Sequence, residues 1–432
     1  MDVTPKRTII VILRIIYIGG TPSWGLNHRW EPLQRFPLRL WHTVLCYDTY
    51  TSIVKYIHMK WIFLFLLLAP AVLSAEVRIS TAAAPGISTN TIRQHILLQR
   101  TIRGIHLTSW GAGSKKLRGE LIRKINDSVI NAVVIAIKEV DGKVYIPGVA
   151  AAHKYGAYTA AISQPEEMLK DFKDAHLYTV ARIVVFKDKV MPVQRHDMAV
   201  HTPDGGVWRA RNGATWLDPY NRDVWDYTLD VAERAARLGF DEIQFDYLRY
   251  PTEGRTELCR YSEPHNAKNA VVNIKDFLVY ARGRLKPYKV KISADVFGMT
   301  TTAKNDMGIG QDIKVIARNV DYIYPMMYPS HYYTGEYNLK NPNSQPYKVI
   351  DRGLKDALKR LGPDYAKLRP YLQDFNLGWH YGPHEVRAQI IAARQNMLDS
   401  WVLWNSGNKY NWAALTPQSF RAFVEPDYGK EK

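Results

Sequence analysis

Cysteine is nearly absent from this sequence. The 432 residues include two cysteines, Cys46 and Cys259, far apart in the chain. Two distant thiols cannot build a disulfide framework or a zinc site of the cysteine type. The neighbours of Cys259, which are Glu257, Arg260 and Tyr261, do not form the pattern of a histidine-paired nucleophile, so a cysteine nucleophile is not expected either.

Motifs of several common enzyme classes are also missing. The sequence has no Gly-rich dinucleotide turn after its first predicted strand and no phosphate loop of the Walker type. It also has no serine nucleophile elbow and no His-Glu-x-x-His. These absences argue against nucleotide-dependent, serine-hydrolase and zinc-protease chemistry. We therefore expect no cofactor and no metal.

Charge is plentiful but not clustered. The chain has 58 Lys and Arg against 41 Asp and Glu, a net charge of +17, without a run of five or six like charges. Scattered basic residues are typical of a solvated surface with a general attraction to anions. This pattern is compatible with an anionic polysaccharide partner, and no nucleic-acid partner is expected.

Residues 59–75 form the most hydrophobic part of the chain. The segment begins with Met59, carries one Lys and continues through an apolar run at 61–73, which is typical of a secretory signal peptide. The run is shorter than the roughly 20 residues of a membrane span. We expect Met59 to be the true start and residues 1–58 to be an upstream extension.

The alternative for this region is a longer anchor, in which residues 9–18 and 61–73 both contact the membrane. Under either interpretation the protein is expected outside the cytoplasm, periplasmic or secreted, with residues 61–73 as the tether if it remains membrane-anchored. Residues 76–100 are rich in Ser, Thr and Ala and indicate a linker.

From residue 101 onward, short apolar runs of strand type alternate with helical patterns such as 223–238. Eight such alternations, without a dinucleotide turn, are typical of a closed parallel barrel. We therefore predict an α/β fold, a single (β/α)8 TIM barrel over residues 101–425. The predicted strands are 104–107, 132–137, 177–185, 242–245, 290–294, 320–324, 368–372 and 400–403.

Acidic residues stand at the C-terminal ends of three of the predicted strands: Asp246, Asp295 and Asp374. In such barrels the C-terminal strand ends carry the catalytic residues. Cleavage of a glycosidic bond needs one carboxylic acid to protonate the leaving oxygen and one carboxylate to attack or to activate water. We predict that these three residues are catalytic in a glycoside hydrolase. The alternative, that an Asp after a strand forms a turn or caps a helix, applies most to Asp374.

The surroundings of the three acids suggest separate roles. Arg249 follows Asp246 by three residues and would keep it ionised as nucleophile or base, unless it holds a substrate carboxylate instead. Asp295 follows apolar residues, and a dry setting would raise its pKa and suit it as the general acid. Asp374 would then orient the substrate or stabilise the transition state.

Other candidate residues lie near the same strand ends. Arg182 lies inside the third predicted strand and needs a carboxylate partner in the barrel, either Asp246 or Glu242. At least two of the tryptophans in loops or at strand ends are expected to be sugar platforms; these are Trp110, Trp208, Trp216, Trp379 and Trp404. The predicted substrate contacts are Trp110, Arg182, Arg249, Tyr328, His331 and Trp404.

The segment 239–251, Gly-Phe-Asp-Glu-Ile-Gln-Phe-Asp-Tyr-Leu-Arg-Tyr-Pro, resembles the putative glycosyl hydrolase domain family of the TIM-barrel glycosidases. Further segments agree in the same order: 103–106, 138–144, 181–188, 216–221, 324–332, 369–375 and 404–405. The resemblance covers about residues 100–425. It implies the barrel fold and carbohydrate substrates.

Two positions depart from related patterns. Ala136 stands in the second predicted strand where the family pattern has an acidic residue. Leu248 stands where the chitinase pattern Asp-x-x-Asp-x-Asp-x-Glu has its catalytic Glu, so a chitinase mechanism is not expected. These departures support an alternative function, a non-catalytic glycan-binding pseudoenzyme of the cell envelope. A third alternative is an envelope scaffold tethered through residues 59–75.

Overall fold

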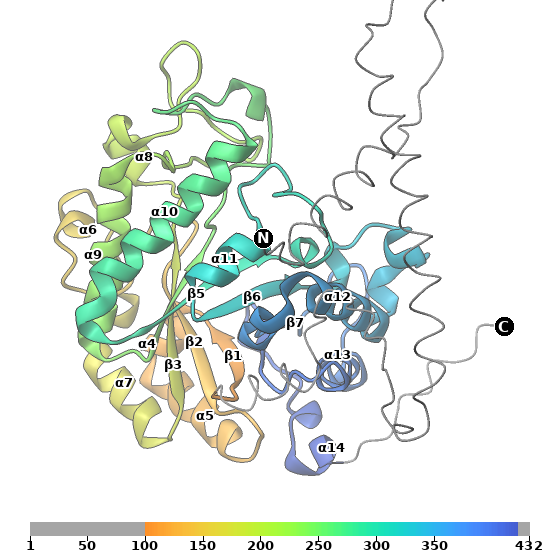
Figure 1. The fold of residues 1–432 in the computed structure, drawn as a ribbon. Coiled ribbons are helices and arrows are strands. Elements are labelled where there is room, and N and C mark those ends of the chain that lie inside the picture. Colours follow the sequence, from red (N-terminus) through yellow and green to blue (C-terminus); the bar gives the residue numbers. More distant parts are fainter. Residues whose placement is uncertain (1–99, 422–432) are drawn as a thin grey trace, which may run out of the picture. The chain divides into compact units, whose positions relative to one another are not determined.

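The computed structural model describes residues 100–421, in which eight parallel strands close into a barrel in sequence order (Figure 1). The predicted (β/α)8 barrel is confirmed. The predicted extension, the hydrophobic segment at 59–75 and nearly all of the predicted linker lie outside the described residues, as does Cys46. The strands are β1 (Arg103–Leu107), β2 (Ala132–Lys138), β3 (Tyr178–Val184), β4 (Glu242–Asp246), β5 (Lys291–Phe297), β6 (Tyr322–Met327), β7 (Tyr371–Gln373) and β8 (Trp401–Trp404).

Helices cover the outside of the barrel, with α9 and α10 on one side and α12 and α13 on the other (Figure 1). None of the described helices is both long and apolar enough to cross a membrane. The helices are α4 (Ser109–Gly113), α5 (Lys115–Asn126), α6 (Ala150–Lys154), α7 (Pro165–Asp174), α8 (Met191–Gln194), α9 (Arg222–Leu238), α10 (Ala267–Leu285), α11 (Ile313–Asn319), α12 (Pro346–Leu361), α13 (Pro383–Gln395) and α14 (Pro417–Arg421).

Helix α9 shows how the sequence sets these elements. The side chain of Asn221 caps its first turn by accepting from the backbone N–H of Asp223, and Gly239 ends the helix at φ 98°. A left-handed conformation of this kind favours glycine. The helix therefore stops just before β4, where Asp246 is placed.

Strand β4 separates the inside of the barrel from its outside by simple alternation. Ile243 and Phe245 face the helices, and the Phe245 ring meets that of Phe277 in α10, with centroids 5.2 Å apart. Glu242 and Gln244 face the interior, where they bond to side chains of β6 and β7. The interior is thus filled in its N-terminal half and presents Asp246 at the C-terminal end.

Strand β2 breaks this alternation. Its pairing with β3 shifts by one residue between Ala136 and Lys138, a bulge that exchanges the faces of the residues after it. Lys138 consequently points outward, where its Nζ lies 2.9 Å from Asp188 Oδ2 and donates to the carbonyl of Val184. The next residue, Glu139, is directed toward β3.

Candidate active site

Asp246 is held at the end of β4 by Arg182 of the neighbouring strand β3. The Arg182 Nε donates to Asp246 Oδ2 at 2.9 Å, and Nη2 donates to the same oxygen. The backbone N–H of Tyr247 donates to Oδ1 at 2.6 Å. Both side chains are buried. Two hydrogen bonds from a cation and one from the backbone stabilise Asp246 as an anion.

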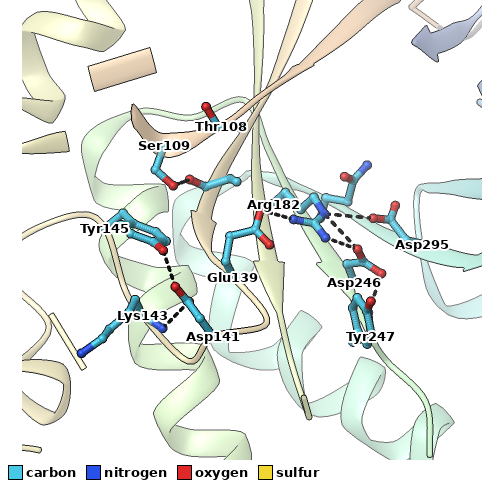
Figure 2. A network of polar contacts seen from close by, with 12 residues as sticks. Thr108, Ser109, Glu139, Asp141, Lys143, Tyr145, Arg182, Asp246, Tyr247 and Asp295 are labelled. Atoms are coloured by element: carbon cyan, nitrogen blue, oxygen red, sulfur yellow. Dashed lines mark hydrogen bonds and ion pairs between the residues drawn. The ribbon is translucent and has the colours of Figure 1, made fainter. Parts of the chain in front are cut away.

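A second carboxylate, Glu139, lies on the same guanidinium. Its Oε1 accepts from Arg182 Nη1 at 2.8 Å, and Figure 2 shows Arg182 between Glu139, Asp246 and Asp295. The Glu139 side chain is partly exposed. Burial lowers the pKa of Arg182, but the charges of Glu139, Asp246 and Asp295 outweigh this effect and raise it well above its ordinary value. Arg182 therefore stays charged.

Asp295, at the C-terminal part of β5, is the most enclosed acid of this group. Its side chain is 1% exposed, and neither carboxyl oxygen has a hydrogen-bond partner among the described residues. Its Oδ2 lies 3.8 Å from Arg182 Nε. Burial, followed by the charge of Asp246, raises the pKa of Asp295 well above its ordinary value. The protonated acid is therefore favoured.

Further polar groups around this centre are buried without a partner among residues 100–421. They are the ring nitrogens of His106, the hydroxyls of Tyr328 and Ser293 and the side-chain nitrogen of Gln244. Burial lowers the pKa of His106, so its ring is neutral, and the ring stacks on Trp404 at 3.8 Å. Buried polar atoms without partners are uncommon in folded proteins and indicate space for a polar ligand or water.

Arg249 is buried near this centre but makes different contacts. Its Nη1 donates to the carbonyl of Tyr250 and to the Thr252 hydroxyl, and its Nη2 faces Glu253 at 3.4 Å. No hydrogen bond or ion pair joins it to Asp246. The cation in contact with Asp246 is Arg182. Asp246 is thus the carboxylate partner that Arg182 needs inside the barrel.

Asp374 follows β7 and faces the loop after β8. Its two oxygens accept from the backbone and side-chain nitrogens of Asn411 at 3.0 and 2.6 Å. Burial raises its pKa to about 6, against the opposing effect of the Asn411 bonds. None of its hydrogen bonds reaches Arg182, Asp246 or Asp295. Its contacts match the turn-forming alternative.

The aromatic candidates divide by exposure. Trp208 and Trp216 are buried in the core, whereas Trp110 in α4 is 61% exposed and Trp379 is exposed in the loop after β7. Trp404 is half-buried beneath the guanidinium of Arg182, whose Cζ lies 4.9 Å from the ring centroid.

Tyr328 and His331 lie together after β6. Tyr328 is buried and His331 is exposed, and their ring centroids are 5.4 Å apart. Burial raises the pKa of Tyr328 well above its ordinary value, so the phenol keeps its proton. Among residues 100–421, no three His, Cys, Asp or Glu side chains are grouped to hold a metal ion.

Residue Glu139 could not be recognised from alternation alone. Without the bulge, period-two counting from Ala136 would turn Lys138 inward and Glu139 outward. His106 could be placed at the end of the first predicted strand, but only the structure shows that its ring nitrogens, like the side-chain nitrogen of Gln244, are buried without partners.

Comparisons with known proteins concern the family and the fold. Residues 104–410 match the family described as a putative glycosyl hydrolase domain. A hypothetical protein from Ruminiclostridium thermocellum ATCC 27405 has 37% sequence identity, with 44% of this chain and 97% of that chain covered and a TM-score of 0.41. The glycoside hydrolase domain of PgaB (BpsB) from Bordetella bronchiseptica is 14% identical, with 74% and 97% covered and a TM-score of 0.57, and shares the fold. No curated protein matches the chain.

Proposed function

The chain belongs to the putative glycosyl hydrolase domain family, and we propose that it cleaves a glycosidic bond of a polysaccharide with Asp246 and Asp295. Membership gives the reaction class, glycoside hydrolysis. The observation that supports this pair of residues is that both lie beside the guanidinium of Arg182 but differ in their hydrogen bonding. Asp246 accepts two hydrogen bonds from Arg182, whereas Asp295 is buried 3.8 Å from the same side chain without a hydrogen-bond partner.

The two acids suit the two roles of the reaction. Asp246 would attack the anomeric carbon or activate water, and Asp295 would donate its proton to the leaving oxygen. The same Arg182 Nε lies 2.9 Å from an oxygen of Asp246 and 3.8 Å from one of Asp295, so the carboxyl groups are neighbours. We propose the retaining arrangement, with a spacing of about 5–5.5 Å, rather than the inverting one, with about 6.5–9.5 Å. Asp246 would then be the nucleophile.

Reducing-end release from a panel of polysaccharides tests this proposal. The wild type should cleave at least one glycan, and Asp246→Asn and Asp295→Asn should each lose roughly 10²–10⁴-fold in rate or more. Asp204→Asn, an exposed position after β3, is the matched control and should retain full rate. Proton NMR of the first product anomer distinguishes retention from inversion.

The alternative is a non-catalytic glycan-binding protein of the cell envelope. The enclosure of Asp295, which is 1% exposed, favours it, because a proton donor must reach the leaving oxygen. A wild type that binds a glycan but never cleaves it, together with Asp246→Asn that binds equally well, would replace the enzyme proposal with this one.

Two extensions rest on sequence. The net charge of +17 supports a polysaccharide with anionic groups, and the hydrophobic segment at 59–75 supports an extracytoplasmic location. Export is tested by N-terminal sequencing of the secreted or periplasmic protein. A mature chain that begins near residue 76 agrees with cleavage of a signal peptide.

A further inference from the structure

Two buried cations lie beside Asp246 and share a single acidic partner. Lys187 and Arg249 are 8% and 3% exposed. Lys187 Nζ lies 3.5 Å and Arg249 Nη2 lies 3.4 Å from the same oxygen, Oε1 of Glu253. Both distances are longer than those of a strong charge-assisted hydrogen bond, which are about 2.7–2.9 Å.

The cations are positioned by aromatic rings rather than by further acids. Lys187 Nζ is 5.8 Å from the centroid of Trp216 and 5.1 Å from that of Tyr247. Arg249 Cζ is 4.9 and 5.0 Å from the same two centroids. Tyr247 directly follows Asp246 and donates its N–H to that carboxylate. Both cations therefore lie against the ring of Tyr247, the residue that directly follows the proposed nucleophile.

The charges of the two arginine sites are balanced differently. Arg182 is in contact with two carboxylates, Glu139 and Asp246. Lys187 and Arg249 have one carboxylate between them, which leaves one positive charge without a partner in this cluster. Buried charges are stable only when they are paired, so the cluster is suited to a second anion.

The donors needed for such an anion are available. Arg249 uses Nη1 to bind the carbonyl of Tyr250 and the Thr252 hydroxyl, which fixes the guanidinium and leaves Nη2 directed at Glu253. Lys187 Nζ has no other hydrogen-bond acceptor within the described part of the chain. Glu253 itself is more than one-third exposed, although its Oε2 is buried without a hydrogen-bond partner among the described residues.

We propose that Lys187 and Arg249 form a binding site for an anionic group of the glycan, next to the bond that Asp246 attacks. The ligand is an oxyanion, either the carboxylate of a uronic acid or a sulfate ester. It binds Lys187 and Arg249 as their second anion, alongside the Glu253 carboxylate. This inference rests on the proposed function and adds the substrate class to it.

Binding is measured in the Asp246→Asn background, so that cleavage does not interfere. The probes are oligomers of galacturonic acid, of sulfated galactose and of unmodified galactose, matched in length, in calorimetric titrations. At least one anionic oligomer should bind about tenfold or more tightly than the neutral one, because a hydrogen bond to a charged group has about this effect. The preference should weaken with added salt. A preference for the galacturonic acid oligomer identifies a carboxylate as the ligand. A preference for the sulfated oligomer identifies a sulfate ester.

Two variants change the preference in opposite directions. Lys187→Gln should bring the ratio of anionic to neutral affinity close to one, and Glu253→Gln should raise it because the competing carboxylate is gone. Lys189→Gln is the matched control: it removes the same charge from an exposed position two residues away and should leave the ratio unchanged.

The inference is overturned if no anionic oligomer is preferred, if none of the three binds, or if Lys189→Gln changes the ratio as much as Lys187→Gln does. The last result would assign the effect to general surface charge. An anionic preference in a wild type that cleaves no glycan supports this site and contradicts the proposed hydrolysis. Cleavage of a glycan without any anionic preference supports the proposed hydrolysis and contradicts this site.

Discussion

Glu242 and Asp246 are the first and last residues of β4, and each is a buried carboxylate bound to an arginine. Around Glu242 the bonding is complete: Tyr324, Tyr178 and Arg369 donate to its two oxygens at 2.8, 2.9 and 2.7 Å. Around Asp246 it is not, because Asp295, His106 and Tyr328 are buried beside it without partners. We refer to Glu242 with Tyr178, Tyr324 and Arg369 as the lower layer. We refer to Asp246 with Arg182, Asp295, His106 and Tyr328 as the upper layer.

The difference separates the needs of the fold from those of a ligand. A closed polar network stabilises the barrel interior and leaves no donor or acceptor for another molecule. Unpartnered buried groups destabilise the folded chain and persist where a substrate or water supplies the missing bonds. In this barrel a paired arginine therefore does not indicate function, since both layers contain one. What distinguishes the upper layer from the lower one is the group of unpartnered atoms around the Asp246–Arg182 pair.

Among the variants of the two layers, Asp295→Asn should have the largest effect on the rate. The rate on any cleaved glycan should fall about 10²–10⁴-fold, because the proton donor is lost. The free energy of unfolding at pH 7 should not fall, because the variant removes a buried acid that lacks a partner. Steady-state kinetics and urea unfolding measure the two quantities. A large loss of stability would mean that the upper layer is a structural network like the lower one.

Glu242→Gln should show the opposite pattern. Arg369 would remain buried without its counter-charge, which should lower the free energy of unfolding by about 3–5 kcal/mol. The rate per folded molecule should stay unchanged, because the lower layer is closed to ligands. Urea unfolding together with active-site titration tests this, with the exposed Glu120→Gln as the matched control. Equal stability of the two variants would contradict it.

The pH dependence of stability sharpens the same comparison. The pKa of Asp295 is raised in the folded state, so between the ordinary value of 3.8 and the folded value the folded chain binds more protons than the unfolded chain. Wild-type stability should therefore decline through this window as pH rises, and Asp295→Asn should not share that part of the decline. Thermal midpoints of the two proteins should diverge from pH 4 upward. A constant difference from pH 4 to 8 would contradict the raised pKa.

Asp374→Asn should have the smallest effect. Because the contacts of Asp374 are with Asn411, the rate should change by less than about threefold and the stability by about 1 kcal/mol. Kinetics on the same glycan measure this. A loss as large as that of Asp295→Asn would return Asp374 to the catalytic group.

All eight strands could be predicted from the sequence, because apolar runs alternating with helical patterns report directly which segments are buried. Their ends were less accurate. The seventh predicted strand began at 368, whereas β7 begins at Tyr371. Pro370 explains part of the difference, since it lacks an N–H and fits poorly inside a strand.

The site was less accessible to sequence reasoning, because its contacts cross between strands. Arg249 is close to Asp246 in sequence, yet the pairing of β3 with β4 brings Arg182 to it, one of the two pairings that the sequence left open for Arg182. Asp374 occupies a strand end like the other two acids, but its orientation depends on Asn411 in a loop after another strand. Burial of Asp295, by contrast, could be anticipated from its apolar neighbours.

The bulge in β2 also constrains how this barrel can change over evolution. Inserting or deleting one residue there reverses the parity of the strand, and Lys138 and Glu139 exchange environments in a single event. A lysine would then approach Arg182 and a glutamate would approach the buried Asp188, and both encounters would be repulsive. Charge pairing thus fixes the length of this strand, and length variation is left to the surface loops.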